Sequence, residues 1–451
     1  MSVAKRAQQH SALIAVGILA VLAVWLWFDL KQPVKEPGEN PKVADLAGIQ
    51  PGDVVRLEVK KGGKSLVAAR EGGPWKLVEP VQGAADSDEV KRLVDGLLDR
   101  QTDFLMEQAP KDLKPFGLDK PSLEVSLTAK SGDRRTLLVG GQDPGKTSYY
   151  VRDAATGRIF LASTSDVNAV KDKDAAGLRD RTLASVPESE IERIRLEKPA
   201  GAVVVARKGA DWELVSPWQA PADSGAVTSL ASRLASLKAD RFVEAGGAGS
   251  PKYGLNVPRL RVVVTRRNGS EAVFRVGAKA KDLAQVYAAR ADSSDVLALQ
   301  EGTLTSLDKT ASDLRSKRLF DLATDQAERV AVSGPKGAWE ARREGGAWKQ
   351  VKPAAGKPAK AQTVDDVLFE ITGTASKHVA EKPASLARYG LDNPVLTVTV
   401  TLKGGAVKQL LVGRPASGDE RFVKTGDSPA VFTLSKFAFD RLNAAPSALK
   451  E

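Results

Sequence analysis

The chain contains no cysteine and only two histidines among its 451 residues. Without a thiol there can be no disulfide, no thiolate zinc or iron–sulfur site, no cysteine nucleophile and no lipid-modified N-terminal cysteine. His10 and His378 stand near opposite ends of the chain, which argues against a mechanism that needs two imidazoles. A Ser-His-Asp arrangement could be built only around His378.

Positive charge is in excess but is not concentrated. The 67 Lys and Arg against 56 Asp and Glu give a net charge of +11. Basic residues form doublets such as Lys60-Lys61 and Arg266-Arg267 but no longer run, and acidic residues are interleaved. Nucleic-acid binding predicts Lys and Arg gathered on one segment or face. We therefore expect no nucleic-acid partner, and a mildly positive surface suited to a domain beside an anionic membrane.

The N-terminus carries one long apolar run, residues 12–28. With Ser11 it would span about 27 Å as a helix, close to the roughly 30 Å of bilayer hydrocarbon. Lys5 and Arg6 precede it, which favours a cytoplasmic tail over residues 1–11. A cleaved signal peptide is the alternative, but bulky residues 25–28 stand where cleavage needs small ones. We predict an uncleaved signal anchor over 12–28, followed by a proline-rich extended spacer over 29–50.

The rest of the chain repeats one pattern three times. A W-x-x-V-x-P motif is followed by an aromatic-Gly-Leu turn and then by a Val-Gly pair, and both intervals are identical in the three copies. The period, from Trp75 to Trp212 and on to Trp348, has the size of an independent domain. The shared positions are Trp75, Trp212 and Trp348; Gly117, Gly254 and Gly390; Pro121, Pro258 and Pro394; and Gly140, Gly277 and Gly413.

Each unit begins with short alternating strands and continues with an amphipathic helix, for which Asp86 is the expected N-cap in the first copy. The helix faces are Val90, Leu93, Val94, Leu97 and Leu98; Val227, Leu230, Leu234 and Leu237; and Val364, Val367, Leu368 and Ile371. More strands and a polar helical stretch follow. We predict an α+β fold: three tandem antiparallel-sheet-plus-helix domains at 51–186, 187–322 and 323–451, after one transmembrane helix.

The first two units close alike, with Leu178-Arg179-Asp180-Arg181 and Leu314-Arg315-Ser316-Lys317. Because this motif leads directly into the next unit, it is expected to be a connector. The third unit is expected to end without it.

One segment imitates a nucleotide-binding motif. Residues Gly140–Thr147 satisfy G-x-x-x-x-G-K-[ST], but a phosphate loop needs a helix after it and residues 148–152 alternate like a strand. The aligned loops that start at Gly277 and Gly413 lack Gly-Lys-Thr. A hairpin without bound nucleotide is therefore predicted at Gly140–Thr147.

The repeated tryptophans have two interpretations. Exposed indoles could stack on sugars, but three equivalent positions in diverged units favour the core, where a large ring buries much area. Trp75, Trp212 and Trp348 are therefore predicted to be core anchors. Trp218 and Trp339 are not repeated and are the better candidates for surface contacts.

Acidic residues in the shared turn are not expected to be catalytic. Asp119, Asn256 and Asp392 alternate between Asp and Asn, and Asn cannot act as a general acid or base. The turn glycines are expected to take positive φ after a short helical turn. His378 has no counterpart in the other units and is expected to be a surface histidine. No catalytic, cofactor-binding or metal-binding residue is predicted.

W-x-L-V-x-P, the helix after it, Tyr-Gly-Leu-Asp-x-Pro, the Val-Gly strand end and the Leu-Arg-Asp-Arg close resemble the bacterial family of domain of unknown function 4340. The resemblance extends from Val54 to the C-terminus. It implies an N-terminal membrane helix, a large extracytoplasmic part and a gene context of ABC-2 type or gliding-motility-associated transporters.

The expected protein is a single-pass inner-membrane protein with its C-terminal domains in the periplasm. Its expected function is that of a non-enzymatic accessory or scaffold protein, whose partner is an ABC-type permease or another envelope protein. A periplasmic binder of envelope glycan or lipid is the alternative, and an uncharacterised hydrolase is the second alternative.

Overall fold

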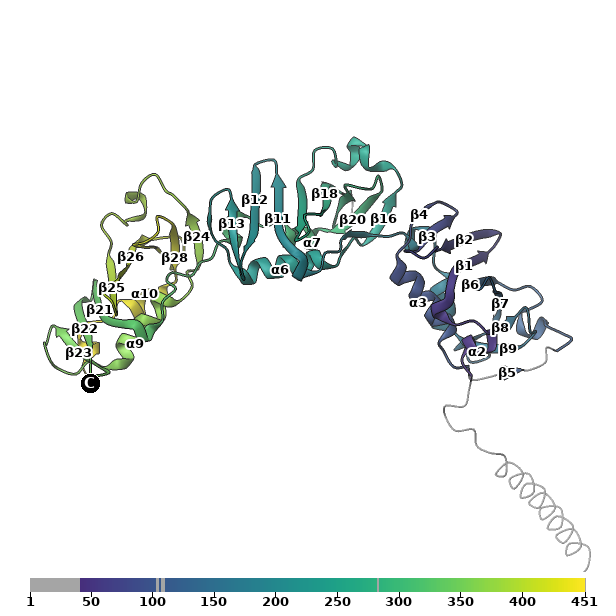
Figure 1. The fold of residues 1–451 in the computed structure, drawn as a ribbon, viewed down its shortest axis with the longest axis horizontal. Coiled ribbons are helices and arrows are strands. Elements are labelled where there is room, and N and C mark those ends of the chain that lie inside the picture. The colour runs from purple at the N-terminus through teal and green to yellow at the C-terminus, as the bar shows by residue number, and fades with distance from the viewer. Residues whose placement is uncertain (1–40, 103–104, 107–109, 282–283, 451) are drawn as a thin grey trace, which may run out of the picture. The chain divides into compact units, whose positions relative to one another are not determined.

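The computed structural model describes residues 41–102, 105–106, 110–281 and 284–450. The described residues divide into two compact units, one up to residue 180 and one from residue 181, and the second unit contains two of the three repeats (Figure 1). The predicted cytoplasmic tail and signal anchor, and the spacer up to residue 40, lie outside the described residues. Among the helices that the structure describes, none is both long and apolar enough to cross a membrane.

The first unit is built on one antiparallel sheet in the order β4-β3-β2-β1-β6-β7-β8-β9-β5. Two meanders, β1 to β4 and β6 to β9, meet in the middle of the sheet, where Leu57 lies opposite Leu127. The strands are β1 Val54–Lys61, β2 Lys64–Ala69, β3 Lys76–Glu79, β4 Gly83–Ala84, β5 Leu105–Met106, β6 Leu123–Ala129, β7 Arg134–Gln142, β8 Ser148–Asp153 and β9 Ile159–Ser163.

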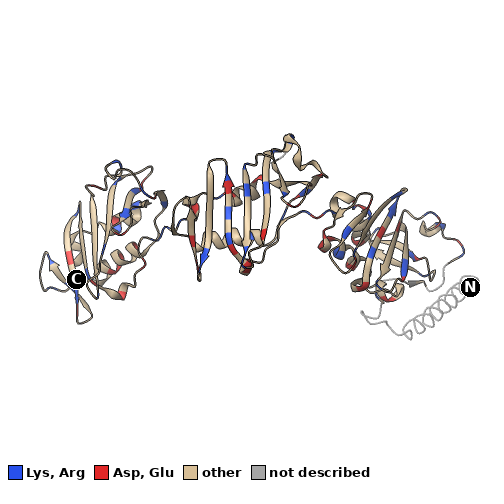
Figure 2. Cartoon of the chain, turned by 45° about the horizontal axis from the view of Figure 1, so that its top comes forward, with Lys and Arg blue, Asp and Glu red and all other residues tan. Residues whose placement is uncertain are grey.

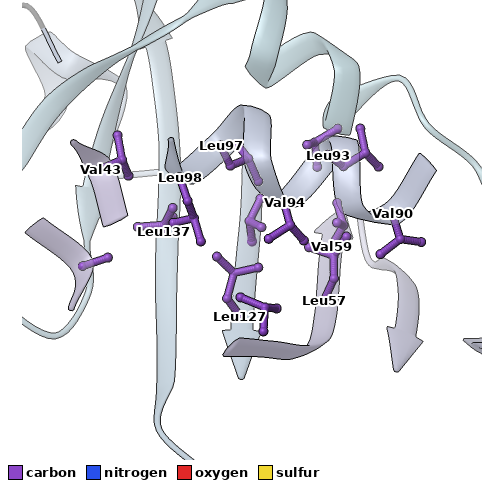
Figure 3. Packing of buried hydrophobic residues seen from close by; sticks show 14 of the residues in the cluster. Val43, Leu57, Val59, Val90, Leu93, Val94, Leu97, Leu98, Leu127 and Leu137 are labelled. Atoms are coloured by element: carbon purple, nitrogen blue, oxygen red, sulfur yellow. The ribbon is translucent and has the colours of Figure 1, made fainter. Parts of the chain in front are cut away.

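Helices cover one face of this sheet and make the core with it. The main one is α3, Ser87–Leu98, and the Asp86 side chain accepts a hydrogen bond from the Glu89 N–H at 3.2 Å, which confirms the predicted N-cap. Its predicted apolar face is buried and meets residues such as Leu57 and Leu127 of the strands (Figure 3). Each such side chain contributes about 1.5–3 kcal/mol when fully buried, so this face fixes the helix on the sheet. Helices α4, Thr164–Lys171, and α5, Ala175–Leu178, complete the layer.

The predicted spacer ends earlier than residue 50. Helix α2, Val43–Ala47, ends at Gly48, whose φ is 66°. Val43, Ala47 and Ile49 are 2–3 % exposed and belong to the core of the first unit. Apolar residues recur here at helical spacing and the prolines of the spacer all precede them, so this segment packs rather than extends.

The second unit contains two large sheets with the same topology, besides a small two-stranded one. Their orders are β14-β13-β12-β11-β17-β18-β19-β20-β16 and β23-β22-β21-β25-β26-β27-β28-β24. The central pairs Ile194↔Val264 and Val330↔Val400 have the same sequence separation as the central pair of the first sheet. In the third sheet the counterpart of β14 is reduced to one bridge, Lys349↔Pro358, so β23 is an edge strand.

The strands of these sheets are β11 Ile191–Lys198, β12 Gly201–Lys208, β13 Asp211–Ser216, β14 Ala220–Pro221, β16 Arg241–Glu244, β17 Leu260–Arg266, β18 Glu271–Lys279, β19 Gln285–Arg290, β20 Val296–Gln300, β21 Ala327–Gly334, β22 Gly337–Glu344, β23 Ala347–Lys352, β24 Lys377–Ala380, β25 Leu396–Leu402, β26 Val407–Pro415, β27 Arg421–Thr425 and β28 Val431–Leu434. The helices are α6 Ser224–Ala235, α7 Glu301–Leu307, α8 Ala311–Leu314, α9 Ala361–Thr372 and α10 Lys436–Leu442.

Leu237 was predicted to lie on the helix of the second unit, but it lies in a strand. Helix α6 ends at Ala235, and Leu237 lies in β15, Leu237–Lys238, which pairs with β10, Thr182–Ala184. Leu237 is nevertheless buried in the core of the second repeat. Its apolar character was therefore interpreted correctly and its secondary structure was not.

Charged residues of both signs are interspersed along the strands of the large sheets (Figure 2). Cross-strand pairs are common, such as Arg134 with Glu58 at 3.1 Å and Arg261 with Glu197 at 2.7 Å. Exposed ion pairs of this kind contribute about 0–1 kcal/mol each, so the open faces are solvated rather than strongly held together by charge.

Candidate functional site

The repeated tryptophans are core residues, as predicted. Trp75, Trp212 and Trp348 are 3–4 % exposed and belong to the cores of their repeats. A guanidinium stacks on each ring at 5.0, 4.2 and 4.7 Å from its centroid, from Arg70, Arg207 and Arg343 respectively. Each arginine precedes its tryptophan by five residues, a regularity that was present in the sequence and was missed. The prolines that end the three motifs, Pro80, Pro217 and Pro353, follow cis peptide bonds.

The structure brings the two repeated glycines of each unit together. Gly117, Gly254 and Gly390 have φ of 64–66° and follow short 3-10 turns, which confirms the predicted conformation. The turn packs directly on the strand that contains the Val-Gly pair, which continues for two residues beyond the glycine instead of ending there as expected. A Cβ added to Gly117 would lie 2.6 Å from the Gly141 nitrogen, and one added to Gly140 would overlap the Phe116 carbonyl oxygen. This backbone contact explains why the interval between the two glycines is the same in every copy.

An aromatic pair accompanies this contact in each repeat. The turn aromatics Phe116, Tyr253 and Tyr389 meet, edge to face, a ring on the following hairpin at 5.0, 4.7 and 5.0 Å between centroids. The partner rings are Tyr150, Tyr287 and Phe422. The interval from the turn aromatic to its partner ring varies by only one position among the copies, a second regularity that sequence reasoning missed. The turn is therefore fixed by packing, and in the second repeat the Asn256 side chain also donates to the Gly249 carbonyl at 2.9 Å.

Residues Gly140–Thr147 form the hairpin connection that the sequence predicted. They link β7 to β8, and the element that follows is a strand. The Asp143 carboxylate accepts hydrogen bonds from the N–H groups of Gly145, Thr147 and Ser148 at 3.2, 2.9 and 2.7 Å. These bonds, the one from Ser148 foremost, lower the pKa of Asp143. The backbone N–H groups that a phosphate would need are thus already hydrogen-bonded to a carboxylate. That the hairpin binds no nucleotide remains a prediction, which titration of the protein with ATP would test.

The connector after the second repeat is bonded to both of its neighbours. The Leu314 carbonyl accepts a hydrogen bond from the Asp223 N–H at 2.8 Å, within the second repeat. Three residues later, the Lys317 carbonyl accepts from the Ala375 N–H at 2.8 Å, in the third repeat. One extended segment therefore pairs with two repeats, which fits the predicted role of a connector.

The expectation that the third repeat lacks this motif was wrong for its leucine. Leu178 and Leu314 are 0–1 % exposed, and so is Leu449. The Leu178 carbonyl accepts from the Asp86 N–H at 2.9 Å, and the Leu449 carbonyl accepts in the same way from the Lys360 N–H at 3.0 Å. The leucine closes the core of its own repeat, and in the third repeat Lys450 follows it where Arg179 and Arg315 follow in the other two.

A buried cluster of charged residues lies beside this connector, where the second and third repeats meet. Arg315 contacts Glu381 at 3.1 Å, and their side chains are only 9 % and 11 % exposed. The Arg315 guanidinium also donates to the Ser316 carbonyl at 2.7 Å and lies 5.4 Å from the centroid of the Phe432 ring. Because removing one partner would leave the other charge buried and unpaired, this pair makes the junction sensitive to substitution.

His378 completes the cluster, and the prediction of a surface histidine was wrong. Its side chain is 1 % exposed, its Nε2 lies 3.2 Å from a Glu381 oxygen and its Nδ1 shares a hydrogen bond with Ser312 at 2.9 Å. Its ring lies 5.5 Å from the rings of both Trp218 and Phe432. Ser312 and Trp218 belong to the second repeat, so the pocket that holds His378 exists only where two repeats meet.

The two tryptophans expected at surface contacts also differ from that expectation. Trp339 is 1 % exposed and its indole N–H donates to the Ala444 carbonyl at 3.0 Å, so it is a core residue. Trp218 is half-buried and its contact is the internal one with His378. Both rings therefore stabilise the fold in the positions described.

A groove of about 880 Å³ lies along the same junction. Its walls include Arg315 and Phe432, so the buried cluster forms part of its floor. Five cationic and five acidic side chains line it: Lys208, Arg315, Lys317, Arg318 and Lys408, and Asp211, Glu213, Asp223, Asp321 and Asp427. Because the two signs balance, the groove has no charge preference for a ligand.

Within the described part of the chain, no three His, Asp or Glu side chains come together as a metal site.

The histidine gives the junction a pH dependence that can be measured. Burial lowers the pKa of His378, and Arg315 and Lys317 act in the same direction, while Glu381 opposes them. In the unfolded chain the imidazole takes up a proton as the pH falls below its ordinary pKa of 6.5, whereas in the folded chain the lowered pKa keeps it neutral. Protonation therefore favours the unfolded chain, and His378 lowers the free energy of unfolding as the pH falls through 6.5. The second repeat has Phe242 at the position that corresponds to His378, so His378→Phe is a suitable variant. We expect this variant to lose less stability than the wild type between pH 7.5 and pH 5.5, as measured by urea unfolding. Equal losses would contradict this assignment.

The family follows from these repeated features. Three segments of the chain, residues 75–214, 212–375 and 355–451, match the model of the family described as Domain of unknown function (DUF4340). The matches together extend from Trp75 to the last residue and cover far more than half of the chain, so the protein belongs to this family, as its motifs indicated. The first two matches begin at the motif tryptophans Trp75 and Trp212. No curated protein matches the chain.

Proposed function

We propose that the protein is a non-enzymatic accessory subunit, anchored in the bacterial inner membrane by residues 12–28, with its three repeats in the periplasm. Its partner in this proposal is an ABC-type permease or another envelope protein of a transport or gliding-motility-like complex. The uncharged apolar run at the N-terminus supports the anchor. The positive net charge suits a domain held beside an anionic membrane.

The observation that carries the proposal is that the residues shared by the three repeats have structural roles. In each repeat, the shared Trp is covered by a guanidinium, the two shared Gly residues form a backbone contact and the connector leucine closes the core. The residues that the three copies have in common therefore build and join the sheets. Shared positions that serve the fold in this way suit a scaffold, which is the role of an accessory subunit.

Co-purification tests this function. The full chain, tagged and expressed at its native level, is recovered from membranes dissolved in a mild non-ionic detergent, and bound proteins are identified by mass spectrometry. We expect a permease and its ATPase to be enriched over a control in which another single-pass periplasmic protein carries the same tag. Enrichment of no permease or envelope protein would contradict the proposal. Recovery of envelope glycan or specific lipid instead would favour the alternative binding function, and hydrolysis of such material would favour an enzyme.

A further inference from the structure

Two exposed phenylalanines stand together on the helical side of the third repeat. Phe369 on α9 is 65 % exposed and Phe437 on α10 is 68 % exposed. The Arg441 guanidinium lies 5.6 Å from the centroid of one ring and 5.5 Å from that of the other. The three side chains therefore form one surface, which we call the Phe–Arg–Phe surface. Figure 1 shows the two helices beside each other under the third sheet.

This surface is held in place before any partner binds. Arg441 contacts Asp366 at 2.6 Å and Glu370 at 3.3 Å, both on α9, and so ties the two helices together. Burial raises the pKa of Glu370, while Arg441 opposes that shift. A guanidinium that is already fixed by carboxylates loses little freedom when its neighbours are covered, and aromatic and Arg side chains are the types enriched in the centres of protein interfaces.

The other repeats do not have this surface. The positions that correspond to Phe369 and Phe437 are Ser232 and Gly302 in the second repeat, and Asp95 and Ser165 in the first. The first two repeats fold without aromatic residues at these two positions, so folding does not explain why the third repeat has Phe369 and Phe437. Exposed aromatic clusters of this kind mark interaction sites.

The charge around the surface points to the chemistry of the partner. Helix α9 carries Asp365, Asp366 and Glu370 and no basic residue. Asp440 of α10 is ion-paired with Lys436 and lies near Lys336 and Arg421. The acidic excess is therefore on α9, whose three carboxylates are balanced by one cation of α10, Arg441, in a chain whose total charge is +11. An anionic lipid surface would be repelled by this region, whereas a cationic apolar segment would be attracted.

We propose that the Phe–Arg–Phe surface docks a protein segment that presents apolar side chains flanked by Lys or Arg, such as one face of a basic amphipathic helix. The apolar side chains cover the two rings, and the flanking cations approach the exposed Asp365 on α9. This inference deepens the proposed function, because it gives the accessory subunit a contact surface and the partner a chemistry.

Binding of a defined peptide tests the surface without the native partner. The probe is a dye-labelled synthetic helix with Leu on one face and Lys on its flanks, titrated with the full chain in non-ionic detergent, with empty micelles as the blank. We expect the double variant Phe369→Ser/Phe437→Ser to weaken binding by about tenfold or more. The same peptide with Glu in place of Lys is expected to bind at least about tenfold more weakly than the Lys peptide.

Controls separate this site from general stickiness. Val407→Ser removes another exposed apolar side chain of the same repeat, 56 % exposed, and is expected to leave peptide binding unchanged. Unchanged binding in the double variant, or equal binding of the Glu peptide, would overturn the proposal. So would Phe-dependent binding to phosphatidylglycerol vesicles without peptide binding, or Phe-dependent self-association in ultracentrifugation. If no partner co-purifies but the peptide still requires both phenylalanines, the proposed function fails and the surface stands.

Discussion

Gly277→Ala is expected to lower the free energy of unfolding by about 3 kcal/mol, the upper end of what an added methyl group costs in a close-packed interior. A Cβ at this position would overlap the Tyr253 carbonyl oxygen and lie 2.9 Å from the Gly254 carbonyl carbon, and both atoms belong to the backbone of the packed turn. Because backbone cannot rotate away as a side chain does, the turn must leave the strand. Urea unfolding of the purified full chain, followed by tryptophan fluorescence, measures the loss.

The same repeat offers a matched control. Gly302 lies in α7, and a Cβ added there would meet no atom within 4 Å. Gly302→Ala should stabilise the chain slightly, by up to about 1 kcal/mol, because alanine is the better helix former. Similar effects of the two substitutions would show that the contact between turn and strand is looser than described.

Glu381→Ala is expected to cost about 3 kcal/mol or more, the usual result of breaking a buried ion pair on one side. Arg315 would keep a buried guanidinium without its carboxylate, and His378 would lose its charged neighbour. Glu381→Gln keeps an acceptor of the same size and should fall between the variant and the wild type. Because Trp218 lies against His378, its fluorescence should report the change at the junction directly.

An exposed pair in the third repeat serves as the control. Glu344 contacts Arg342 and Lys349, and its side chain is 38 % exposed. Glu344→Ala should cost less than about 1 kcal/mol, since water replaces the lost partner. If the two glutamate variants lost equal stability, the Arg315–Glu381 pair would not be the buried contact that holds this junction.

Much of the fold could be predicted because the chain repeats one sequence pattern three times. The helix faces of α3, α6 and α9, apart from Leu237, follow from local spacing, as do the left-handed turn glycines and the hairpin at residues 140–147. The arginines five residues before each tryptophan were equally predictable, because they obey the same period.

The junction could not be predicted in the same way. His378 is buried by Trp218, which belongs to the preceding repeat and has no repeated counterpart, so neither local spacing nor the repeat indicated the contact. Leu449 was missed for a different reason: the motif was sought as four residues, and only Leu449 and Lys450 resemble it in the third unit, whereas the core needs its leucine alone. Contacts that occur once, between repeats, are the ones that require a three-dimensional arrangement.

The edge strand β23 also bears on aggregation. An unpaired edge offers backbone N–H and C=O groups to any other strand, and proteins limit this with lysine and proline. In β23, Lys349 and Lys352 are exposed and Pro353 follows directly. The proline of the W-x-x-V-x-P motif has no N–H to donate, so the position that marks the repeat in the sequence also discourages a second molecule from extending the sheet.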